Sequence, residues 1–235
     1  MVSHAQGRLV QDLLQDLKGC NAVPFKVILT LNVPEQLPFD AAAFPFPVRV
    51  LRNAAPRGFG ANHNAAFAAS EERFFCVLNP NIRLPRDPFP ALLSRLENPA
   101  IAAAAPLIRN PTGEIEDHAR PFPTLSSLAL KFFKKQTAIR DVSSPFMPDW
   151  IAGMFMLFRR DAFAAVGGFD EGYFMYYEDV DLCARLLAAG LRVEVNPAAS
   201  AVHDARRASR RSLRHMLWHA GSMARFLGKR WLRKA

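Results

Sequence analysis

The sequence has few cysteines and no long apolar run. Its three cysteines, Cys20, Cys76 and Cys183, lie far apart and form no CxxC pair. This spacing excludes a disulfide framework and a zinc knuckle, and it favours a reducing compartment. The start MVSHAQGRLV lacks the basic and apolar regions of a secretory signal, and no stretch of about 18 apolar residues is present. We therefore expect a cytoplasmic protein without a membrane-spanning helix.

Acidic residues are nearly missing from the last part of the chain. Residues 201–235 hold ten Lys or Arg and a single acid, Asp204, whereas the preceding 200 residues hold twenty of each sign. The net charge of +9 therefore belongs to this tail. A basic tail suits an anionic partner, such as a lipid surface, a nucleic acid or a phosphate-bearing ligand. No nucleic-acid recognition motif accompanies it, so we expect no nucleic acid as a partner.

The tail also has the periodicity of an amphipathic helix that starts near Ser209. Its apolar stripe either packs on the folded domain, with the basic face outward, or lies on an anionic membrane leaflet, and both can hold together. We divide the chain into a domain at 1–204 and a basic amphipathic extension at 205–235. The apolar side holds Leu213, Met216, Leu217, Ala220, Ala224, Leu227 and Trp231, and the other side holds Arg210, Arg211, Arg214, Arg225, Lys229 and Arg233.

The first 200 residues alternate between strand-like and helix-like segments. This alternation is typical of an α/β domain with a mostly parallel sheet flanked by helices. Half of the residues are apolar, which is enough to bury a core in one large domain or two small ones. Residues 110–148 are irregular and rich in Pro and Ser, as in functional or mobile loops. Helices are predicted at 7–19, 62–74, 87–98 and 180–190, and strands at 25–31, 46–53, 74–85, 100–110, from 149, and at 191–197.

Polar clusters follow several of the predicted strands, where open α/β sheets bind their ligands. The stretch RGFGANHNAAF at 57–67 places Gly58 and Gly60 where a backbone can approach a ligand closely, at the start of a helix. The same residues also suit an ordinary turn capped by asparagine. We expect His63 in this stretch to face solvent.

Two further clusters carry candidate metal ligands and acids. NPN at 79–81 presents two side-chain oxygens, which suit a divalent cation but are equally common in a plain turn. YYEDVD begins a helix, where we expect Asp181 to complement the helix dipole and to pair with Arg185. Glu178 and Asp179 follow an aromatic-rich loop, and a carboxylate that is desolvated by such a loop is suited to act as a general base.

Together, in this order, these pieces resemble family 2 glycosyltransferases of the GT-A fold. The strongest match is 150–204, which contains GMFMLFRRDAFAAVGGFDEGYFMYYEDVDLCAR and a later VHD. The family carries G-x-x-x-L-x-R-R-x-x-F-x-x-V-G-G-F-D-E there, then E-D-x-D-L-x-x-R and V-x-H. RGFGANHNAAF resembles its G-F-(G/A)-x-x-x-N turn, and LNPN resembles the L-N-P-D of its bacterial rhamnosyltransferase-like branch. The resemblance covers nearly the whole chain.

The resemblance implies an inverting glycosyltransferase that acts on lipopolysaccharide, O-antigen or other cell-surface glycans. It implies a dTDP- or UDP-sugar as donor, with rhamnose as the sugar, and a glycan or lipid-linked acceptor. A lipid-linked acceptor suits a cytoplasmic enzyme that is peripheral on the inner membrane. The alternative is a nucleotide-sugar-binding pseudoenzyme with an eroded metal site, and the presence of Glu178, Asp179 and His203 counts against it.

The resemblance also implies roles for single residues. Asp179, next to Glu178, matches the catalytic base that takes the proton of the acceptor hydroxyl. Asn79 and Asn81 match the metal-binding pair and His203 a late metal ligand, so that Mg²⁺ or Mn²⁺ would neutralise the departing diphosphate. The donor-binding residues are Asn32, Arg57, Gly58, Asn64 and Asn79, and the residues that border the sugar and the acceptor are Trp150 and Gly153.

The sequence departs from the family pattern at two places. Position 81 is Asn where the family has Asp, which lowers the negative charge of the metal site. The family opens with a strand such as VSVVIVSH, of which only MVSH is present, so that either translation starts upstream or the form is trimmed. We therefore expect a truncated first strand whose neighbours lose hydrogen-bond partners. No acid follows the second strand, where Asn32 is the nearest polar residue.

Overall fold

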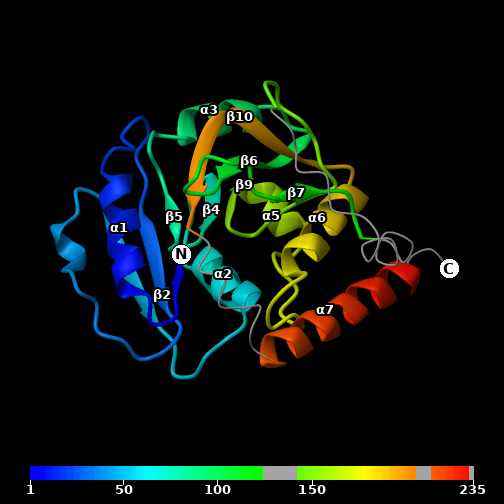
Figure 1. Cartoon of the computed structure of the whole chain (residues 1–235), viewed down its shortest axis with the longest axis horizontal. Helices are drawn as coiled ribbons and strands as arrows, with labels where there is room; N and C mark the ends of the chain where they lie inside the picture. Colours follow the sequence, from blue (N-terminus) through cyan, green and yellow to red (C-terminus); the bar gives the residue numbers. More distant parts are fainter. Residues whose placement is uncertain (124–141, 205–212, 233–235) are drawn as a thin grey trace.

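Two sheets form the centre of the computed structural model, which describes residues 1–123, 142–204 and 213–232 (Figure 1). The first sheet is parallel and has the order β1-β2-β3, from β1 (Val2–Ser3), β2 (Val27–Leu31) and β3 (Val48–Arg52). Helix α1 (Gly7–Leu17) joins β1 to β2. Its apolar residues recur at helical spacing and are buried, namely Val10, Leu13, Leu14 and Leu17.

The second sheet is mixed and has the order β4-β9-β6-β10-β5. Strands β6 and β10 are parallel, whereas β9 runs antiparallel to both of its neighbours and β5 is antiparallel to β10. The α/β class is therefore confirmed, but only the first sheet is fully parallel. The strands are β4 (Phe74–Leu78), β5 (Ile82–Arg83), β6 (Ile101–Arg109), β9 (Phe155–Arg159) and β10 (Arg192–His203).

Short helices and one small ribbon connect these strands. The helix expected at 62–74 begins earlier, because Gly58 caps it and the Asn62 amide donates to the Gly58 carbonyl at 3.1 Å. The connecting elements are η1 (Ala41–Ala43), α2 (Phe59–Ala68), α3 (Phe89–Leu96), the antiparallel pair β7 (Ala119–Arg120) and β8 (Trp150–Ile151), α5 (Arg160–Ala165) and α6 (Glu178–Ala188).

Strand β1 is short, with two residues, and pairs with β2 next to the amino terminus. The amino group of Met1 is buried and donates to the Ile28 carbonyl at 2.9 Å, and burial lowers its pKa to about 6. Next to Met1, a largely apolar cavity of about 420 Å³ separates β2 from β4, with Ile28 and Phe75 among its lining residues. Neither Asp179 nor His203 lines this cavity, so it is separate from the candidate site.

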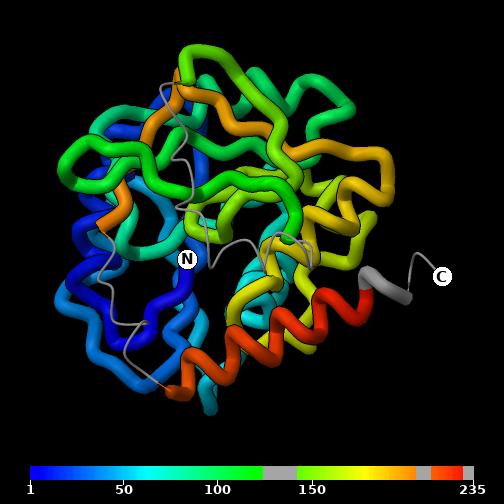
Figure 2. Tube along the Cα trace, turned by 45° about the vertical axis from the view of Figure 1, so that its right-hand side comes forward, coloured from blue at the N-terminus to red at the C-terminus, as the bar shows by residue number. Residues whose placement is uncertain are grey.

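Helix α7 (Leu213–Leu232) runs along one side of the molecule, beside the loop that leads into α6 (Figures 1 and 2). The predicted helix is confirmed from Leu213 onward. Its expected start at 209, together with Arg210, Arg211 and Arg233, lies outside the described residues, as does the Trp231 side chain. In the described ranges, no helix is both long enough and apolar enough to span a bilayer.

Candidate functional site

Asp179 stands at the start of α6 with its carboxylate held by backbone amides. Its Oδ2 accepts from the Gly153 amide at 2.9 Å, and its Oδ1 accepts from the Val180 amide at 2.8 Å. A Cβ atom added at Gly153 would lie 3.2 Å from the ring of Phe59, the first residue of α2. The sequence motifs around 58, 153 and 179 are therefore in contact in the folded chain.

Glu178 and Asp179 have different surroundings, although they are neighbours. Glu178 is 6% exposed, and its Oε2 has no hydrogen-bond partner among the described residues. Burial, together with the Asp179 charge, raises the pKa of Glu178 to about 8. Burial also raises the pKa of Asp179, but the amides of Gly153 and Val180 and the charge of Arg120 oppose that rise. Near neutral pH Glu178 therefore keeps its proton, while the two amides and the charge of Arg120 favour the ionised form of Asp179.

The loop before this acidic pair has a strained backbone. Tyr176 and Tyr177 have φ angles of 70° and 63°, a left-handed region that aromatic residues rarely adopt. Just upstream, the carbonyl of Phe174 accepts from the Phe59 amide at 2.9 Å. The strained loop therefore connects the start of α2 to the residue pair that begins α6.

A cluster of buried asparagines fixes the turn before α2. The Asn32 Oδ1 accepts from the Asn53 side chain (2.8 Å), the Arg57 amide (2.8 Å) and the Asn62 side chain (3.1 Å). The Asn32 Nδ2 donates to the Arg57 carbonyl at 3.0 Å. Asn32 thus holds the Arg57 peptide from both sides, while the Arg57 side chain is exposed and reaches Glu171 at 3.5 Å. Asn32 was expected from the sequence, but Asn62 was not, because its spacing from Gly58 was the only sign of its role.

The glycines of this turn approach another part of the chain. A Cβ atom at Gly58 would lie 2.8 Å from the Phe174 carbonyl oxygen, and one at Gly60 would lie 2.7 Å from the Phe169 side chain. The Asn64 side chain bonds the amide and the carbonyl of Phe169 at 2.9 and 2.8 Å. These contacts account for the glycines and for Asn64 by packing of α2 against the segment 168–174.

The expectation that His63 faces solvent is wrong. His63 is 1% exposed and its ring lies 4.5 Å from that of Phe59, centre to centre. Neither ring nitrogen has a hydrogen-bond partner in the described part of the chain. Desolvation therefore lowers the pKa of His63 well below its usual value, and the ring is neutral. The sequence did not reveal this, because His63 falls on the inner face of a helix whose start was predicted too late.

The predicted metal ligands lie at the meeting of β5 and β10. His203 Nε2 is 2.8 Å from Asn81 Nδ2, and its Nδ1 is 2.7 Å from a carboxylate oxygen of Glu116. The Asn79 amide donates to the Met154 carbonyl at 2.9 Å, next to Gly153. The structure therefore brings Asn79 to the segment that also holds Asp179, and it places Asn81 against His203. Among the described residues, no group of three or more His, Cys, Asp or Glu is arranged to hold a metal ion.

Two charged residues of the site come from the irregular middle of the chain. Glu116 orients His203, and Arg120 sits with its guanidinium 5.8 Å from the ring centre of Trp150 and pairs with Asp117. The charge of Arg120 is one of the causes that hold down the pKa of Asp179. Neither Glu116 nor Arg120 was expected from the sequence. The polar run EIEDHAR, which contains both and lies in a long connection, could have indicated a functional segment. Residues 124–141 of that connection lie outside the described ranges.

The chain is similar in sequence to known glycosyltransferases. A family described as the N-terminal domain of galactosyltransferase matches residues 136–209. Rhamnosyltransferase WbbL of Escherichia coli (strain K12) is 35% identical over 187 residues, which cover 74% of this chain and 71% of that protein. The N-acetylglucosaminyl-diphospho-decaprenol L-rhamnosyltransferase of Mycobacterium tuberculosis (strain ATCC 25618 / H37Rv) is 31% identical over 263 residues, which cover 97% of this chain and 83% of that protein.

Solved structures show the same fold at low sequence identity. The structure of GalNAc-T7 with UDP, GalNAc and Mn²⁺ has a TM-score of 0.64 at 14% identity, over 87% of this chain and 43% of that one. The mannosyltransferase PcManGT of Pyrobaculum calidifontis, in complex with GDP-Man and Mn²⁺, has a TM-score of 0.61 at 14% identity, over 95% of this chain and 62% of that one. The chain thus spans less than two thirds of either solved protein, and the likeness concerns the fold.

Proposed function

Because the chain belongs to the glycosyltransferase family that includes these two bacterial rhamnosyltransferases, we propose that it transfers rhamnose with inversion of the anomeric configuration. The donor is a dTDP- or UDP-sugar, and the acceptor is a hydroxyl of a lipid-linked or cell-surface glycan. The name of the mycobacterial relative supports a lipid diphosphate acceptor. The observation that carries the proposal is the Asp179 carboxyl group, which the amides of Gly153 and Val180 hold in one direction next to a protonated Glu178.

In this proposal Asp179 is the general base. Its carboxylate takes the proton of the acceptor hydroxyl while the hydroxyl oxygen attacks the anomeric carbon, and the bond from that carbon to the diphosphate oxygen breaks. One displacement of this kind inverts the configuration. The Gly153 and Val180 amides fix the direction of the carboxylate. Because Glu178 is protonated, it places no negative charge next to Asp179.

The donor side is proposed to lie along the turn that Asn32 fixes. Arg57 has an exposed side chain there, and Arg120 is a cation near Asp179, so both can meet the negative diphosphate. Gly58 and Asn64 act by holding α2 against the segment 168–174, which shapes this side of the site. Trp150 and Gly153 border the sugar and the acceptor, because Gly153 donates to the base and the ring of Trp150 lies against Arg120.

A divalent cation fits this site through neutral ligands. Glu116 orients His203, as a carboxylate does behind a metal-bound imidazole, and the Asn81 side chain already meets His203 Nε2. His203 and Asn81, with Asn79, would hold Mg²⁺ or Mn²⁺, and the diphosphate would bring the missing negative charge. When bound, the cation would neutralise the leaving diphosphate.

We further propose that the enzyme works as a cytoplasmic, peripheral protein of the inner membrane, where a lipid-linked acceptor is found. The basic charge of the tail supports attraction to an anionic leaflet. The exposed apolar residues of α7 supply the other half of such an attachment.

The test is transfer from a panel of nucleotide sugars to a prenyl-diphosphate-linked acceptor, with the product configuration read by NMR. Asp179→Asn should lower kcat by about 10²–10⁴ while the donor still raises the melting temperature. The matched control is Asp161→Asn, because Asp161 is an exposed acid on α5 whose partner is Arg159. An active Asp179→Asn variant, or a product of retained configuration, would refute the assigned mechanism.

A further inference from the structure

Helix α7 packs on the domain through the face opposite to Leu213 and Leu217. Ser222 and Phe226 are buried, the Ser222 hydroxyl donates to the Met175 carbonyl at 2.8 Å, and the Tyr176 hydroxyl lies 2.8 Å from a ring nitrogen of His215. These residues lie about half a turn away from Leu213 and Leu217 on the helix. Packing of the apolar stripe on the domain, one of the two alternatives, therefore holds for Leu227, which is partly buried against the core. The other large apolar residues of the stripe whose side chains are described, namely Leu213, Met216 and Leu217, are exposed.

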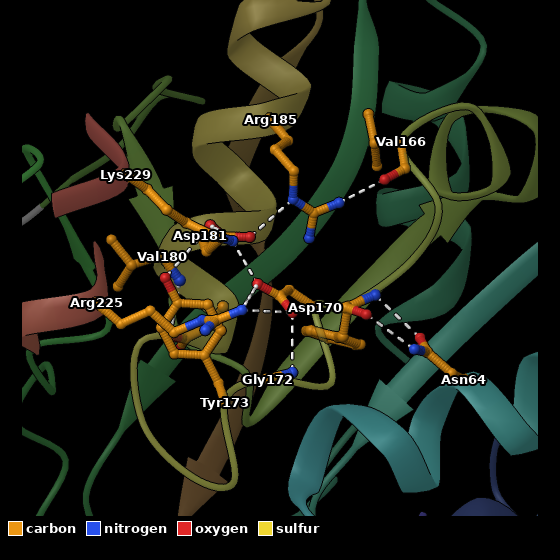
Figure 3. A network of polar contacts seen from close by, with 12 residues as sticks. Asn64, Val166, Asp170, Gly172, Tyr173, Val180, Asp181, Arg185, Arg225 and Lys229 are labelled. Atoms are coloured by element: carbon orange, nitrogen blue, oxygen red, sulfur yellow. Dashed lines mark hydrogen bonds and ion pairs between the residues drawn. The ribbon is translucent and has the colours of Figure 1, made fainter. Parts of the chain in front are cut away.

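Ion pairs explain why the helix turns this way (Figure 3). Arg225 and Lys229 both reach the Asp170 carboxylate, and Lys229 also lies 3.1 Å from Asp181. Asp181 in turn accepts from Arg185 at 2.7 Å, so the expected pairing is confirmed but is part of a larger network. Asp181 is buried and Asp170 is half-buried, and carboxylates removed from water need cationic partners. Arg225 and Lys229 are therefore drawn toward the domain, and Leu213 and Leu217 on the other side of the helix are turned outward.

The outward face of α7 is apolar and open to solvent. Leu213 is 78% exposed, Leu217 is 72% exposed and Met216 is 59% exposed, and Ala220 and Ala224 continue the same face. No residue of α7 is acidic. Exposed leucines in a row are uncommon on a soluble surface and mark an interaction site.

We propose that the outward face of α7 docks on an anionic lipid bilayer and thereby places the active site at the membrane surface. The proposal rests on the proposed function for the acceptor, whereas the docking itself follows from the surface. A helix with one apolar face, basic flanks and no acid is suited to lie in the interface of an anionic leaflet. Arg214 lies beside the outward apolar face of α7. The sequence from 205 to 235 contains no acidic residue.

Helix α7 also contacts the loop that leads to the base. Phe174 is 40% exposed, and its ring centre lies 4.7 Å from that of Trp218 on α7. The same residue receives the Phe59 amide, and the strained Tyr176–Tyr177 pair follows it directly. A bilayer that holds α7 therefore also holds the loop between the donor turn and Asp179, on the side from which a lipid-linked acceptor would arrive.

The test is co-sedimentation of the full chain with phosphatidylcholine vesicles, with and without phosphatidylglycerol. Wild type should bind the anionic vesicles more tightly, and salt should weaken the binding. Leu213→Ser/Leu217→Ser should weaken it by about tenfold or more, because two leucines no longer enter the interface. The control is Met147→Ser, which removes an apolar side chain that is 53% exposed outside α7. Both variants should melt like wild type.

Three results would overturn the proposal: a wild type that does not bind anionic vesicles, a double variant that binds as well as wild type, or a second copy on this face. The third would appear as a concentration-dependent dimer that the double variant abolishes while vesicle binding is unchanged. Transfer to a soluble short-chain acceptor separates the two proposals. A wild type that transfers sugar to the soluble acceptor but does not bind anionic vesicles refutes only the docking. A wild type that binds the vesicles but transfers no sugar refutes only the proposed function.

Discussion

Glu178→Gln tests whether the folded protein holds the Glu178 carboxyl group in its protonated form. Burial raises the pKa of this carboxyl from 4.5 to about 8, which corresponds to about 5 kcal/mol between its charged and neutral folded forms. Because the folded pKa lies above the unfolded one, the acid stabilises the fold fully below pH 4.5. It loses that contribution as pH rises toward 8. Glutamine does not titrate, so the variant should escape this loss.

The expected result is a difference in pH dependence, measured by urea unfolding between pH 5 and 9. Relative to wild type, Glu178→Gln should gain about 2–5 kcal/mol in unfolding free energy between the two ends of that range. Most of the gain should fall below pH 8, where the folded wild type still has to bind a proton that the unfolded chain releases. Equal slopes for the two proteins would show that Glu178 is not held protonated.

A matched control uses another buried carboxylate. Glu194 is 1% exposed, but it pairs with Arg95 through two bonds of 2.6 and 3.2 Å. Glu194→Gln removes the charge from a satisfied pair and should lower stability by about 1–3 kcal/mol. The same chemical change should therefore stabilise one site at alkaline pH and destabilise the other.

Three further predictions concern the turn, the buried histidine and the metal site. Gly58→Ala should lower stability by about 1–3 kcal/mol, because its Cβ would lie 2.8 Å from a backbone oxygen, whereas Gly221→Ala has open space and should be neutral or stabilising in thermal melts. His63→Leu should raise the unfolding free energy by about 1 kcal/mol. That gain should widen as pH falls below 6.5, where only the unfolded imidazole of wild type takes up a proton; a constant difference would contradict the buried neutral ring. Glu116→Gln should raise the Mn²⁺ concentration for half-maximal activity by about 10–100-fold, and an unchanged requirement in a metal titration would remove Glu116 from the metal site.

The sequence predicted elements with strong periodicity and missed contacts between distant segments. Helix α1 and the strand β2 follow from apolar spacing, and the motif at 178–181 follows from its helix start. The direction of β9 does not follow, because it depends on a long connection without periodicity. The partnership of Glu116 with His203 joins residues 87 positions apart, and local propensity carries no information on such a pair.

The orientation of α7 shows a different limit. Its two faces are clear in the sequence, but a periodic pattern does not say whether protein or another medium covers the apolar one. The answer depends on Asp170 and Asp181, whose burial beside α7 becomes visible only in the folded chain. Asp181 was expected to pair with Arg185 within α6, and it does. Its second partner, Lys229, comes from the far end of the sequence.

The ion-pair attachment of α7 has a consequence for how this protein can evolve. Because Asp170, Arg225 and Lys229 secure the helix, the fold places little demand on what stands at 213, 216 and 217. Substitutions at these positions change the stability of the fold little. Selection therefore acts on them through the interactions that this surface makes. The surface can therefore be adjusted to a new environment one residue at a time, without passing through an unstable intermediate. The residues beneath the helix lack that freedom, since each change there alters the fold and the site together.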